Sequence, residues 1–557
     1  MREYISTLKN LSLCILILLI PNFVLASAPT PLEQSIEKRI AQMSLEEKVG
    51  QLFIVGFPQK DITKELDKFI RTYKPGSFLL FKRNILSLAQ VKKLNADLTR
   101  LSYDTSELPP LLAIDQEGGS VSRLPLFPTQ PNALALGQTQ SPALAEEMGY
   151  QTGLFLREVG FNMNLAPVLD VVDPKSRSFI GVRSFGPDPE IVKDVGVAYS
   201  RGLLRSRVIP TAKHFPGTGN LALDPHQVIV ENAATSVSLR ERDLVPYQAY
   251  AELGRPVAVM LSHLLYPSLD PSREPASFSK KISTDLLRGE MKYQGLVMTD
   301  DLQMQGSKQL LRPEVAALRA LKAGADIVML SWSFADQGKA FNHVKKAVQS
   351  GDFAEKDLND KLRRILYTKA FANNYKRDPA IPSMIAGSVL TSPNYHQLEE
   401  QIFSQNLQSS LLVTHLPAKE TSARKPASQE VVCTIAPSKD FITSFKAERT
   451  RKEPTRLLNG NFDKTEVESW IKSRSCDVVL LAITGPKTAQ LAGSLAPKTR
   501  SKTLVVNLST PRWVPNNKGY LKVVQLSFNH MESGKRIAQN LTKLLDETHV
   551  TSVDHGE

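Results

Sequence analysis

The sequence predicts an α/β protein in which an N-terminal (β/α)8 TIM barrel precedes a smaller C-terminal α/β sandwich domain. Its 557 residues exceed the size of one ordinary core, so two domains are expected. Eight short apolar runs alternate with longer amphipathic stretches, which indicates a parallel sheet buried on both faces. A second set of apolar runs follows a stretch rich in Pro, Ser and Asn.

Residues 1–28 have the layout of a secretory signal peptide. Arg2 and Lys9 precede the apolar run LSLCILILLI, and VLASA then offers small residues for cleavage after Ala26 or Ala28. The uninterrupted apolar run is too short to span a bilayer well. We therefore expect an exported protein, periplasmic or secreted, with no stable transmembrane segment once the signal is removed.

The barrel is predicted over residues 29–372. It opens with a helical unit in which Ser44 is the N-cap and Glu47 follows three residues on. Eight strand-helix units over this length are typical of a closed barrel. The predicted strands cover 49–57, 76–81, 111–115, 162–170, 208–215, 256–263, 295–301 and 325–332. The predicted helices between them cover 88–101, 143–159, 189–204, 239–253, 283–293 and 312–324, and a further helix over 356–372 ends the barrel.

The rest of the chain is predicted to hold a linker over residues 373–395 and a second domain over 396–557. A helix is expected near 396–410, and a parallel sheet is expected from the apolar runs after it. These runs cover 409–416, 430–436, 476–483, 502–509 and 521–528.

The charge is strongly positive, with 69 Lys and Arg against 56 Asp and Glu. Residues 401–557 carry 22 of these basic and 14 of these acidic residues, and so hold most of the excess. Such a charge favours electrostatic attraction to an anionic cell envelope, although an evenly solvated basic surface explains it equally well. No basic motif interleaved with aromatic residues indicates nucleic-acid binding.

Cys433 and Cys476 are the two cysteines outside the predicted signal peptide, and each lies in an apolar, strand-like run. Export permits a disulfide bond. A bridge needs closely matched Cα positions, so two buried thiols are the expectation here.

Polar residues gather where the predicted barrel strands end. Asp115 and Glu117, Asp170, Lys213 and His214, His263, and Asp300 and Asp301 all follow strands at their carboxyl ends. Barrel enzymes build their sites at this end. Successive strand residues point in opposite directions, so only one member of the Asp300-Asp301 pair is expected to point into the mouth, and the other is expected to cap the following helix.

Three segments resemble the bacterial β-N-acetylglucosaminidases of glycoside hydrolase family 3, which trim N-acetylglucosamine from peptidoglycan fragments. They are IDQEGGSVSRL, KHFPGTGNLALDPH and VMTDDLQM, and they occur in the family's order within residues 36–367. The second domain resembles, more loosely, the smaller α/β domain of some members.

The resemblance implies a role for eight residues. It implies that Asp300 is the nucleophile of a covalent glycosyl-enzyme and that His226, partnered by Asp224, is the acid/base. The positions implied to contact the sugar are Asp115, Arg123, Arg183, Lys213 and His214. No cofactor or metal ion is implied.

The chemistry suits these residue types. Retaining cleavage needs a carboxylate on one side of the anomeric carbon and a proton donor on the other. Imidazole titrates near neutrality, so it can protonate the leaving oxygen and then activate water. Asp224 would orient the ring of His226, and Gly217 and Gly219 give the segment conformational freedom.

Two departures from the family pattern bear on whether the barrel is catalytic. Thr218 stands where the family usually has His, and Pro225 replaces a small residue between the members of the dyad. They lend some weight to a non-catalytic cell-wall-binding barrel.

Two further functions are compatible with the predicted barrel. One is a β-glucosidase or β-xylosidase of the same family. The second is a metal-dependent hydrolase that uses His214, His226, His263 and Asp300, but these residues lack the compact spacing of a metal-ligand set. The sequence leaves water and phosphate both open as acceptor.

Overall fold

The computed structural model describes most of the chain. The residues described are 29–124, 130–173, 176, 178–221, 230–304, 311–373, 393–410, 431–436, 439–448, 454–458, 463–483, 486–500, 503–507, 522–525 and 537–539. The predicted signal peptide and nearly all of the predicted linker lie outside these ranges. Contacts divide the chain into two compact units, residues 1–42 and 43–557.

Eight parallel strands close into a barrel, as predicted from the apolar runs. Their order around the ring is β1-β10-β9-β8-β7-β6-β3-β2, so β1 pairs with both β2 and β10. The barrel strands are β1 (Phe53–Val55), β2 (Ser77–Leu80), β3 (Leu111–Ile114), β6 (Met163–Asn164), β7 (Ile209–Phe215), β8 (Ala258–Leu261), β9 (Leu296–Asp301) and β10 (Ile327–Leu330). All eight fall within the predicted runs.

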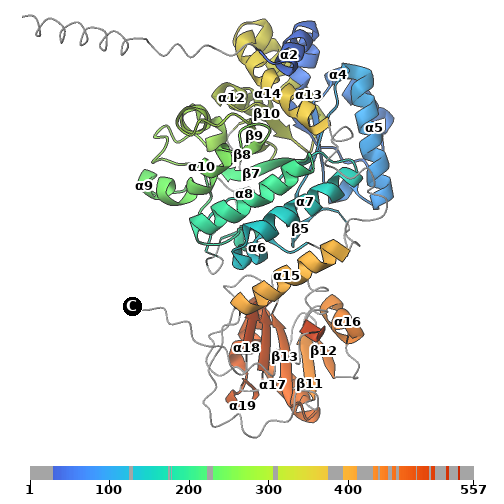
Figure 1. The fold of residues 1–557 in the computed structure, drawn as a ribbon, viewed down its shortest axis with the longest axis vertical. Coiled ribbons are helices and arrows are strands. Elements are labelled where there is room, and N and C mark those ends of the chain that lie inside the picture. The colour runs from blue at the N-terminus through green and yellow to red at the C-terminus, as the bar shows by residue number, and fades with distance from the viewer. Residues whose placement is uncertain are drawn as a thin grey trace, which may run out of the picture. The chain divides into compact units, whose positions relative to one another are not determined.

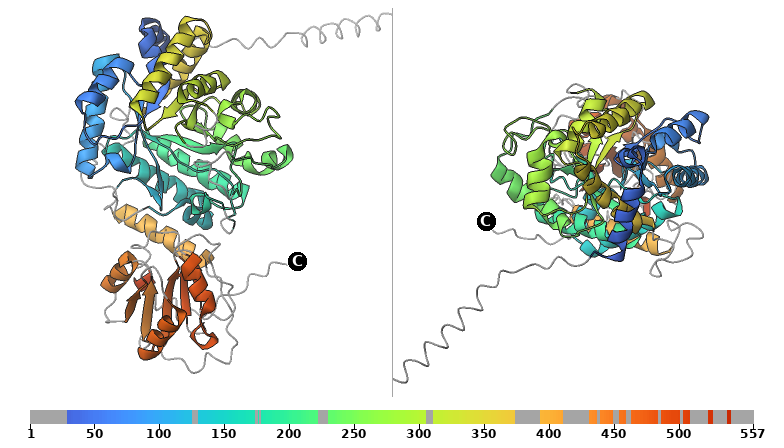
Figure 2. Two further views of the ribbon diagram at one scale, coloured as in Figure 1. Left: turned by 180° about the vertical axis from the view of Figure 1, so that it is seen from behind. Right: turned by 90° about the horizontal axis from the view of Figure 1, so that it is seen from above.

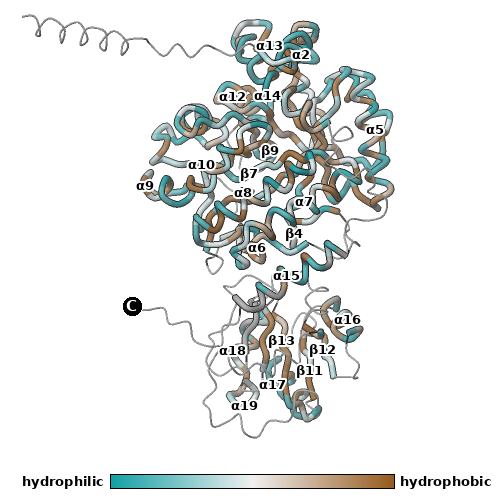
Figure 3. Tube along the Cα trace, in the orientation of Figure 1, coloured by the Kyte–Doolittle hydropathy of each residue, from teal (hydrophilic) through white to brown (hydrophobic). Residues whose placement is uncertain are grey.

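Helices surround these strands in the views of Figures 1 and 2, with α7 and α8 side by side across the front of Figure 1. The strands are buried, apart from Asp300 in β9, because helices cover the outside of the ring and side chains fill its inside. Figure 3 shows the resulting contrast between apolar strands and polar outer helix faces.

The helical elements of the barrel region are bounded as follows: α3 (Leu45–Gly50), α4 (Lys64–Tyr73), η2 (Lys82–Asn84), α5 (Leu88–Ser106), α6 (Ala133–Thr139), α7 (Pro142–Glu158), η3 (Gly181–Arg183), α8 (Pro189–Arg205), α9 (Ser236–Ser238), η4 (Leu239–Asp243), α10 (Val245–Ala251), η5 (Ala276–Phe278), η6 (Lys281–Glu290), α12 (Pro313–Ala323), α13 (Phe334–Gln349) and α14 (Glu355–Asn373). None of the helices within the described ranges is both long and apolar enough for a bilayer crossing.

The opening unit is two helices rather than one. Helix α2 (Pro31–Gln42) belongs to the first compact unit, and α3 begins after Ser44. The predicted capping box is present, because the Ser44 hydroxyl accepts from the Glu47 N–H and the Glu47 carboxylate accepts from the Ser44 N–H. Helix α2 ends at Gln42, and this reciprocal cap starts α3 at Leu45.

An ion cluster fixes the amino end of the barrel. Asp326, which precedes β10, is fully buried and accepts hydrogen bonds from Arg288 at 2.6 Å and from Arg364 at 2.7 Å. It also accepts from the Val297 N–H of β9 at 2.9 Å. The two arginines outweigh burial and hold the pKa of the Asp326 carboxyl below its usual value. This end of the barrel therefore serves stability, which leaves the carboxyl ends of the strands for chemistry.

The second sheet lies in the C-terminal region and is parallel throughout, as predicted. Its strand order is β12-β11-β13-β14-β15. The elements of this region are α15 (Pro393–Ser410), β11 (Val432–Ala436), α16 (Lys439–Glu448), β12 (Thr455–Leu457), α17 (Lys464–Ser473), β13 (Val478–Ile483), α18 (Pro486–Ser494), α19 (Pro497–Arg500), β14 (Thr503–Asn507) and β15 (Lys522–Gln525). The predicted strand over 409–416 is wrong at its start, since residues 409 and 410 end α15, and its remainder lies outside the described ranges.

The expectation of two buried thiols is wrong. Cys433 and Cys476 form a disulfide bond, with their Cα atoms 5.7 Å apart. The bond is possible because β11 and β13 are neighbours, with Cys433 paired to Val479. Cys476 lies just before β13, so the strand pairing itself brings the two sulfur atoms together. Both cysteines belong to one apolar core cluster of this region.

Breaking this bond is expected to destabilise the C-terminal region. We predict that Cys433→Ser lowers its free energy of unfolding by about 2–5 kcal/mol, because the bond constrains a long loop of the unfolded chain. Urea unfolding of the variant and the wild type measures the difference. Alkylation of the urea-unfolded wild type without reductant is the control, since it should modify neither Cys433 nor Cys476; prompt modification of both would contradict the bond.

Candidate functional site

The mouth of the barrel collects charged side chains from strands on different sides of the ring. In the closed order of strands, β3 stands opposite β9, with three strands between them in either direction. Strand β7 lies two positions from each. Polar groups at the carboxyl ends of β3 and β7 can therefore meet each other, while Asp300 lies near the end of β9, on the side of the ring opposite β3.

Glu117, Lys213 and Arg183 form a buried ion cluster at the base of the mouth. The Lys213 ammonium lies 2.6 Å from the Glu117 carboxylate. Arg183 donates to both oxygens of the same carboxylate, at 2.7 and 2.8 Å. Only 4% of the Glu117 side chain and 3% of the Lys213 side chain are exposed, so water barely screens these charges. The bidentate contact also fixes the orientation of Arg183.

The protonation states of this cluster follow from its geometry. Burial alone would raise the pKa of the Glu117 carboxyl, but the charges of Arg183 and Lys213 outweigh it and hold that pKa well below its usual value. Burial alone would lower the pKa of the Lys213 ammonium, but Asp115 and Glu117 outweigh it and raise that pKa. The cluster is therefore ionised at neutral pH.

Asp115 and Arg123 form a more exposed layer above the cluster. Lys213 donates to one Asp115 oxygen at 2.8 Å. The Arg123 guanidinium lies 3.8 Å from the other oxygen, which is too long for a hydrogen bond. The Nε of Arg123 is buried and has no hydrogen-bond partner in the described structure. Because a buried donor without a partner is costly, this layer leaves hydrogen-bonding capacity for a ligand.

Gln116 fixes the small hairpin that carries Arg123. Strands β4 (Gln116–Gly118) and β5 (Val121–Ser122) pair antiparallel at the mouth, an element that the apolar pattern of the sequence did not predict. The Gln116 side chain accepts from the Arg123 N–H at 3.1 Å and donates to the Ser122 hydroxyl at 2.6 Å. The hairpin therefore turns the chain back so that Arg123 stands above Asp115.

Two glycines are required in this turn. Gly118 and Gly119 have φ angles of 96° and 54°, which side chains disfavour. A Cβ atom on Gly118 would lie 2.2 Å from the Pro131 carbonyl oxygen, and one on Gly119 would lie 2.5 Å from the Cβ of Asn132. The hairpin thus requires glycine at both positions.

His214 is held by a buried carboxylate. Its Nδ1 lies 2.7 Å from one Asp170 oxygen, and the other oxygen accepts from the Thr218 N–H at 2.8 Å. This contact occupies Nδ1 of the ring. Asp170 thus links β7 to the start of the next loop. The Thr218 hydroxyl is buried without a hydrogen-bond partner in the described structure.

The loop after β7 has its two ends joined at a neck. The Gly217 carbonyl accepts from the Tyr266 hydroxyl at 2.9 Å and from the Asn232 amide at 3.2 Å. Asn232 thereby ties the end of the loop to its beginning. Asp224 and His226, the predicted acid/base pair, lie outside the described residues, as does Pro225. Both flanks of that segment are anchored beside the Asp170–His214 pair.

Asp300 and Asp301 have different surroundings, as the alternation along a strand requires. Asp301 is buried and accepts from the Ser331 hydroxyl and from the Gln303 N–H. Burial, opposed by these hydrogen bonds and supported by the charge of Asp300, raises the pKa of Asp301 to about 6. Asp300 is only partly buried. Asp301 stabilises the turn after β9 and the adjoining end of β10, and Asp300 is the more accessible carboxylate.

Two residues of this site received no role from the sequence. Glu117 is two residues beyond Asp115, a spacing that puts both side chains on the same side of an extended chain, and this was the available signal. Asp170 was recognised as a polar strand end, but its pairing with His214 depends on a contact between β7 and residues after β6 that no local pattern reveals. Arg183, Lys213, His214, Asp115 and Arg123, by contrast, do lie together.

Asp243, at the end of η4, is a buried carboxylate beneath the neck. A Cβ atom on Gly217 would lie 2.7 Å from the Asp243 side chain, so the backbone approaches it closely. One Asp243 oxygen has no hydrogen-bond partner in the described structure, and the other lies 3.5 Å from Arg242. Burial raises the pKa of Asp243 to about 7; Arg242 opposes the rise and Asp170 adds to it.

This carboxylate predicts an unusual dependence of stability on pH. The folded state holds the Asp243 proton more tightly than the unfolded chain does, so ionisation costs stability as the pH rises from about 4 to about 7. Asp243→Asn lacks this cost. We expect the stability of the variant relative to wild type to increase with pH, by up to about 1.4 kcal/mol per pH unit in that window.

Urea unfolding of both proteins at pH 5 and pH 8 measures this effect. The surface variant Asp352→Asn is the control for removing a carboxylate. A difference between Asp243→Asn and wild type that is the same at both pH values would contradict the prediction.

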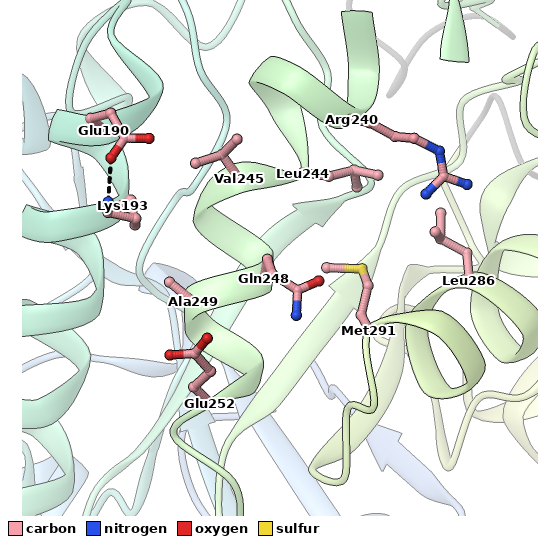
Figure 4. Close-up of a pocket in the computed structure, with 10 residues that line it drawn as sticks. All are labelled: Glu190, Lys193, Arg240, Leu244, Val245, Gln248, Ala249, Glu252, Leu286 and Met291. Atoms are coloured by element: carbon pink, nitrogen blue, oxygen red, sulfur yellow. Dashed lines mark hydrogen bonds and ion pairs between the residues drawn. The ribbon is translucent and has the colours of Figure 1, made fainter. Parts of the chain in front are cut away.

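In the part of the chain that the structure describes, the outer pockets lie away from the residues at the mouth. Within the described ranges, no group of three or more His, Cys, Asp or Glu residues could hold a metal ion. A pocket of about 350 Å³ lies between α8, α10 and η6 and is shown in Figure 4. Its lining mixes acidic, basic and apolar side chains and includes none of the residues at the mouth.

Comparison with known proteins assigns the chain to a family. The model of the glycosyl hydrolase family 3 N terminal domain matches residues 44–368, which is more than half of the 557 residues. A β-hexosaminidase of Pseudomonas aeruginosa is 35% identical over 268 residues, covering 48% of this chain and 78% of the relative. β-Hexosaminidase A of Pseudoalteromonas piscicida is 29% identical over 359 residues, covering 61% of this chain. The match spans 60% of the length of that relative.

A solved structure extends the likeness to both sheets. The glycoside hydrolase family 3 β-N-acetylglucosaminidase from Paenibacillus sp. str. FPU-7 aligns with a TM-score of 0.78 at 27% identity, covering 90% of this chain and 97% of that chain. The resemblance seen in the sequence motifs is therefore confirmed over the barrel. The chain belongs to glycosyl hydrolase family 3 and is a glycoside hydrolase.

Proposed function

We propose that the protein is a retaining exo-β-N-acetylglucosaminidase that releases terminal N-acetylglucosamine from peptidoglycan-derived or related glycans. The observation that carries this proposal is the opposition of two groups across the mouth. Asp300 near the end of β9 is accessible, and the Asp115–Arg123 layer with free hydrogen-bonding capacity lies on the β3 side. The names of the P. aeruginosa and Paenibacillus relatives support the choice of sugar.

The layered ion cluster suits the non-reducing end of a sugar. Asp115 can accept from sugar hydroxyls, and the guanidinium of Arg123, whose side chain is 31% exposed, can donate to them. Glu117, Lys213 and Arg183 below are already paired, so they hold the outer layer rigidly at little cost during binding. A sugar held by this layer reaches across the mouth, with its anomeric carbon on the side of Asp300.

The proposed reaction has two steps. An Asp300 oxygen attacks the anomeric carbon, the bond to the leaving oxygen breaks, and His226 gives its proton to that oxygen. A water molecule then attacks the anomeric carbon while His226 takes a proton from that water, and the bond between this carbon and Asp300 breaks. The anomeric carbon is inverted twice, so the configuration is retained.

His226 is supported as the acid/base by its place in the sequence. Its segment begins and ends at the neck where Asn232 bonds the Gly217 carbonyl, beside the Asp170–His214 pair. The loop follows β7, which is two strands from β3 and two from β9 in the ring. Asp224 is the partner that the family resemblance gives to His226.

The cellular setting is part of the proposal. Residues 1–28 favour export, and the positive charge of residues 401–557 favours association with an anionic envelope. Both features suit an enzyme that acts on cell-wall fragments.

The sugar preference can be tested directly. We expect kcat/KM for 4-nitrophenyl β-N-acetylglucosaminide to exceed that for the matching β-glucoside by at least about tenfold, because interactions with the acetamido group are lost in the glucoside. Equal or reversed preference would favour a β-glucosidase.

Absence of turnover with either sugar would favour the non-catalytic barrel. Activity that survives a strong chelator would eliminate a metal-dependent hydrolase.

The nucleophile can be tested by chemical rescue. We expect Asp300→Ala to lower kcat at least about a thousandfold, and azide to restore turnover by forming the α-glycosyl azide, since azide replaces the missing carboxylate. His226→Ala should also lose most activity but give the β-glycosyl azide with an activated aryl substrate. NMR of the anomeric proton distinguishes the products. Asp352→Ala, at an exposed ion pair, is the matched control. Full activity of both Asp300→Ala and His226→Ala would overturn the mechanism.

A further inference from the structure

Trp332 is an exposed aromatic side chain at the mouth of the barrel. It is the second residue after β10, which is the neighbour of β9, the strand that carries Asp300. Its side chain is 59% exposed. Single exposed apolar residues are common on protein surfaces and by themselves mean little. The way in which Trp332 is held distinguishes it.

Hydrogen bonds fix the backbone of Trp332 relative to the catalytic strand. The Trp332 N–H donates to the Gln303 side chain at 2.7 Å. The Gln303 N–H in turn donates to the Asp301 carboxylate at 3.0 Å. Asp301 also binds the hydroxyl of Ser331, the residue before Trp332. Trp332 is thus connected to the neighbour of Asp300 by two short paths.

A cation holds the indole ring from one side. The Arg83 guanidinium lies 4.2 Å from the Trp332 ring and 4.1 Å from the Phe81 ring, and the two rings are 6.0 Å apart. Arg83 is fixed by donating to the Ser331 carbonyl at 2.7 Å and to the Phe57 carbonyl at 3.2 Å. One face of the indole is therefore covered by Arg83, and the large exposed fraction belongs to the other face and the edge.

The ordering of Trp332 costs conformational entropy without burying the ring. When an exposed side chain at a binding site is already held in place, a ligand that packs against it buries its surface at little further cost in conformational entropy. The face of a pyranose ring carries C–H groups with partial positive charge, which suit the negative face of an indole. Trp332 therefore has the chemistry of a stacking surface for a sugar.

The position of Trp332 indicates which sugar stacks on it. The Asp115–Arg123 layer on the β3 side holds the hydroxyls of the terminal sugar, and its anomeric carbon lies toward Asp300 on β9. The equatorial bond of a β-glycoside continues in that direction, away from the clamp. The rim after β10 lies on this side of the ring, so the unit that meets it is the one being released.

We propose that Trp332 is the platform for the leaving-group sugar, so that the enzyme prefers a pyranose aglycone over a small one. This rests on the proposed function. The platform acts by stacking and takes no part in bond making or breaking. Its loss raises KM for a disaccharide and leaves the terminal-sugar subsite intact.

The test compares two substrates that share the terminal sugar. N,N′-diacetylchitobiose has a sugar aglycone, and methyl β-N-acetylglucosaminide has one too small to reach the platform. Trp332→Ala is expected to lower kcat/KM for the disaccharide about tenfold, mainly through KM, and to change that for the methyl glycoside less than about twofold. Trp332→Phe should keep most of the disaccharide activity, because it retains an aromatic face.

Tyr103→Ala is the matched control. Tyr103 is also an exposed aromatic residue, 47% exposed, but it lies in the last turn of α5 toward the opposite end of the barrel. Tyr103→Ala should leave kcat/KM for both substrates unchanged. An unchanged kcat/KM of Trp332→Ala for the disaccharide, or an equal fall for both substrates, overturns the platform while the proposed function stands. If the wild-type protein cleaves neither substrate, the proposed function fails and the platform fails with it.

Discussion

The site depends on the Lys213 ammonium, which joins two carboxylates that follow a different strand of the barrel. It lies 2.8 Å from Asp115 and 2.6 Å from Glu117, and is almost completely buried. Burying a lone charge would be prohibitive, so each of the three groups requires the others. Because Lys213 belongs to β7 and the carboxylates follow β3, their contact also sets the spacing of strands two positions apart in the ring. The same interaction thus shapes the barrel and prepares its mouth for a polar ligand.

Asp300 and Asp301, the adjacent carboxylates at the end of β9, have different roles. Asp301 is buried and organises the turn and the start of the Trp332 rim, whereas Asp300 remains accessible. At both strand ends a buried carboxylate lies close in sequence to a more exposed one. Lys213 joins Glu117 to Asp115, and the Asp301 N–H donates to the Asp300 carboxylate at 2.8 Å.

Much of this architecture follows from local sequence patterns. The eight barrel strands, the capping box at Ser44 and the convergence of Lys213 with Asp115 were predictable, because apolar periodicity and strand-end chemistry are local signals. The place of Arg183 beside them was implied only by the resemblance to the family. The β4–β5 hairpin was not predicted, since its strands are two or three residues long. The Cys433–Cys476 bond and the Asp170–His214 pair depend on which strands become neighbours, and no short stretch of sequence carries that information.

The neck formed by Gly217, Asn232 and Tyr266 has a consequence for how the protein can change. The Gly217 carbonyl, just after β7, joins Asn232 and also Tyr266, which follows β8. Insertions or deletions within residues 222–229 that keep these three residues would leave their contacts and the β7–β8 pairing in place. This part of the chain can therefore vary in length during evolution while the ends of the two strands stay joined.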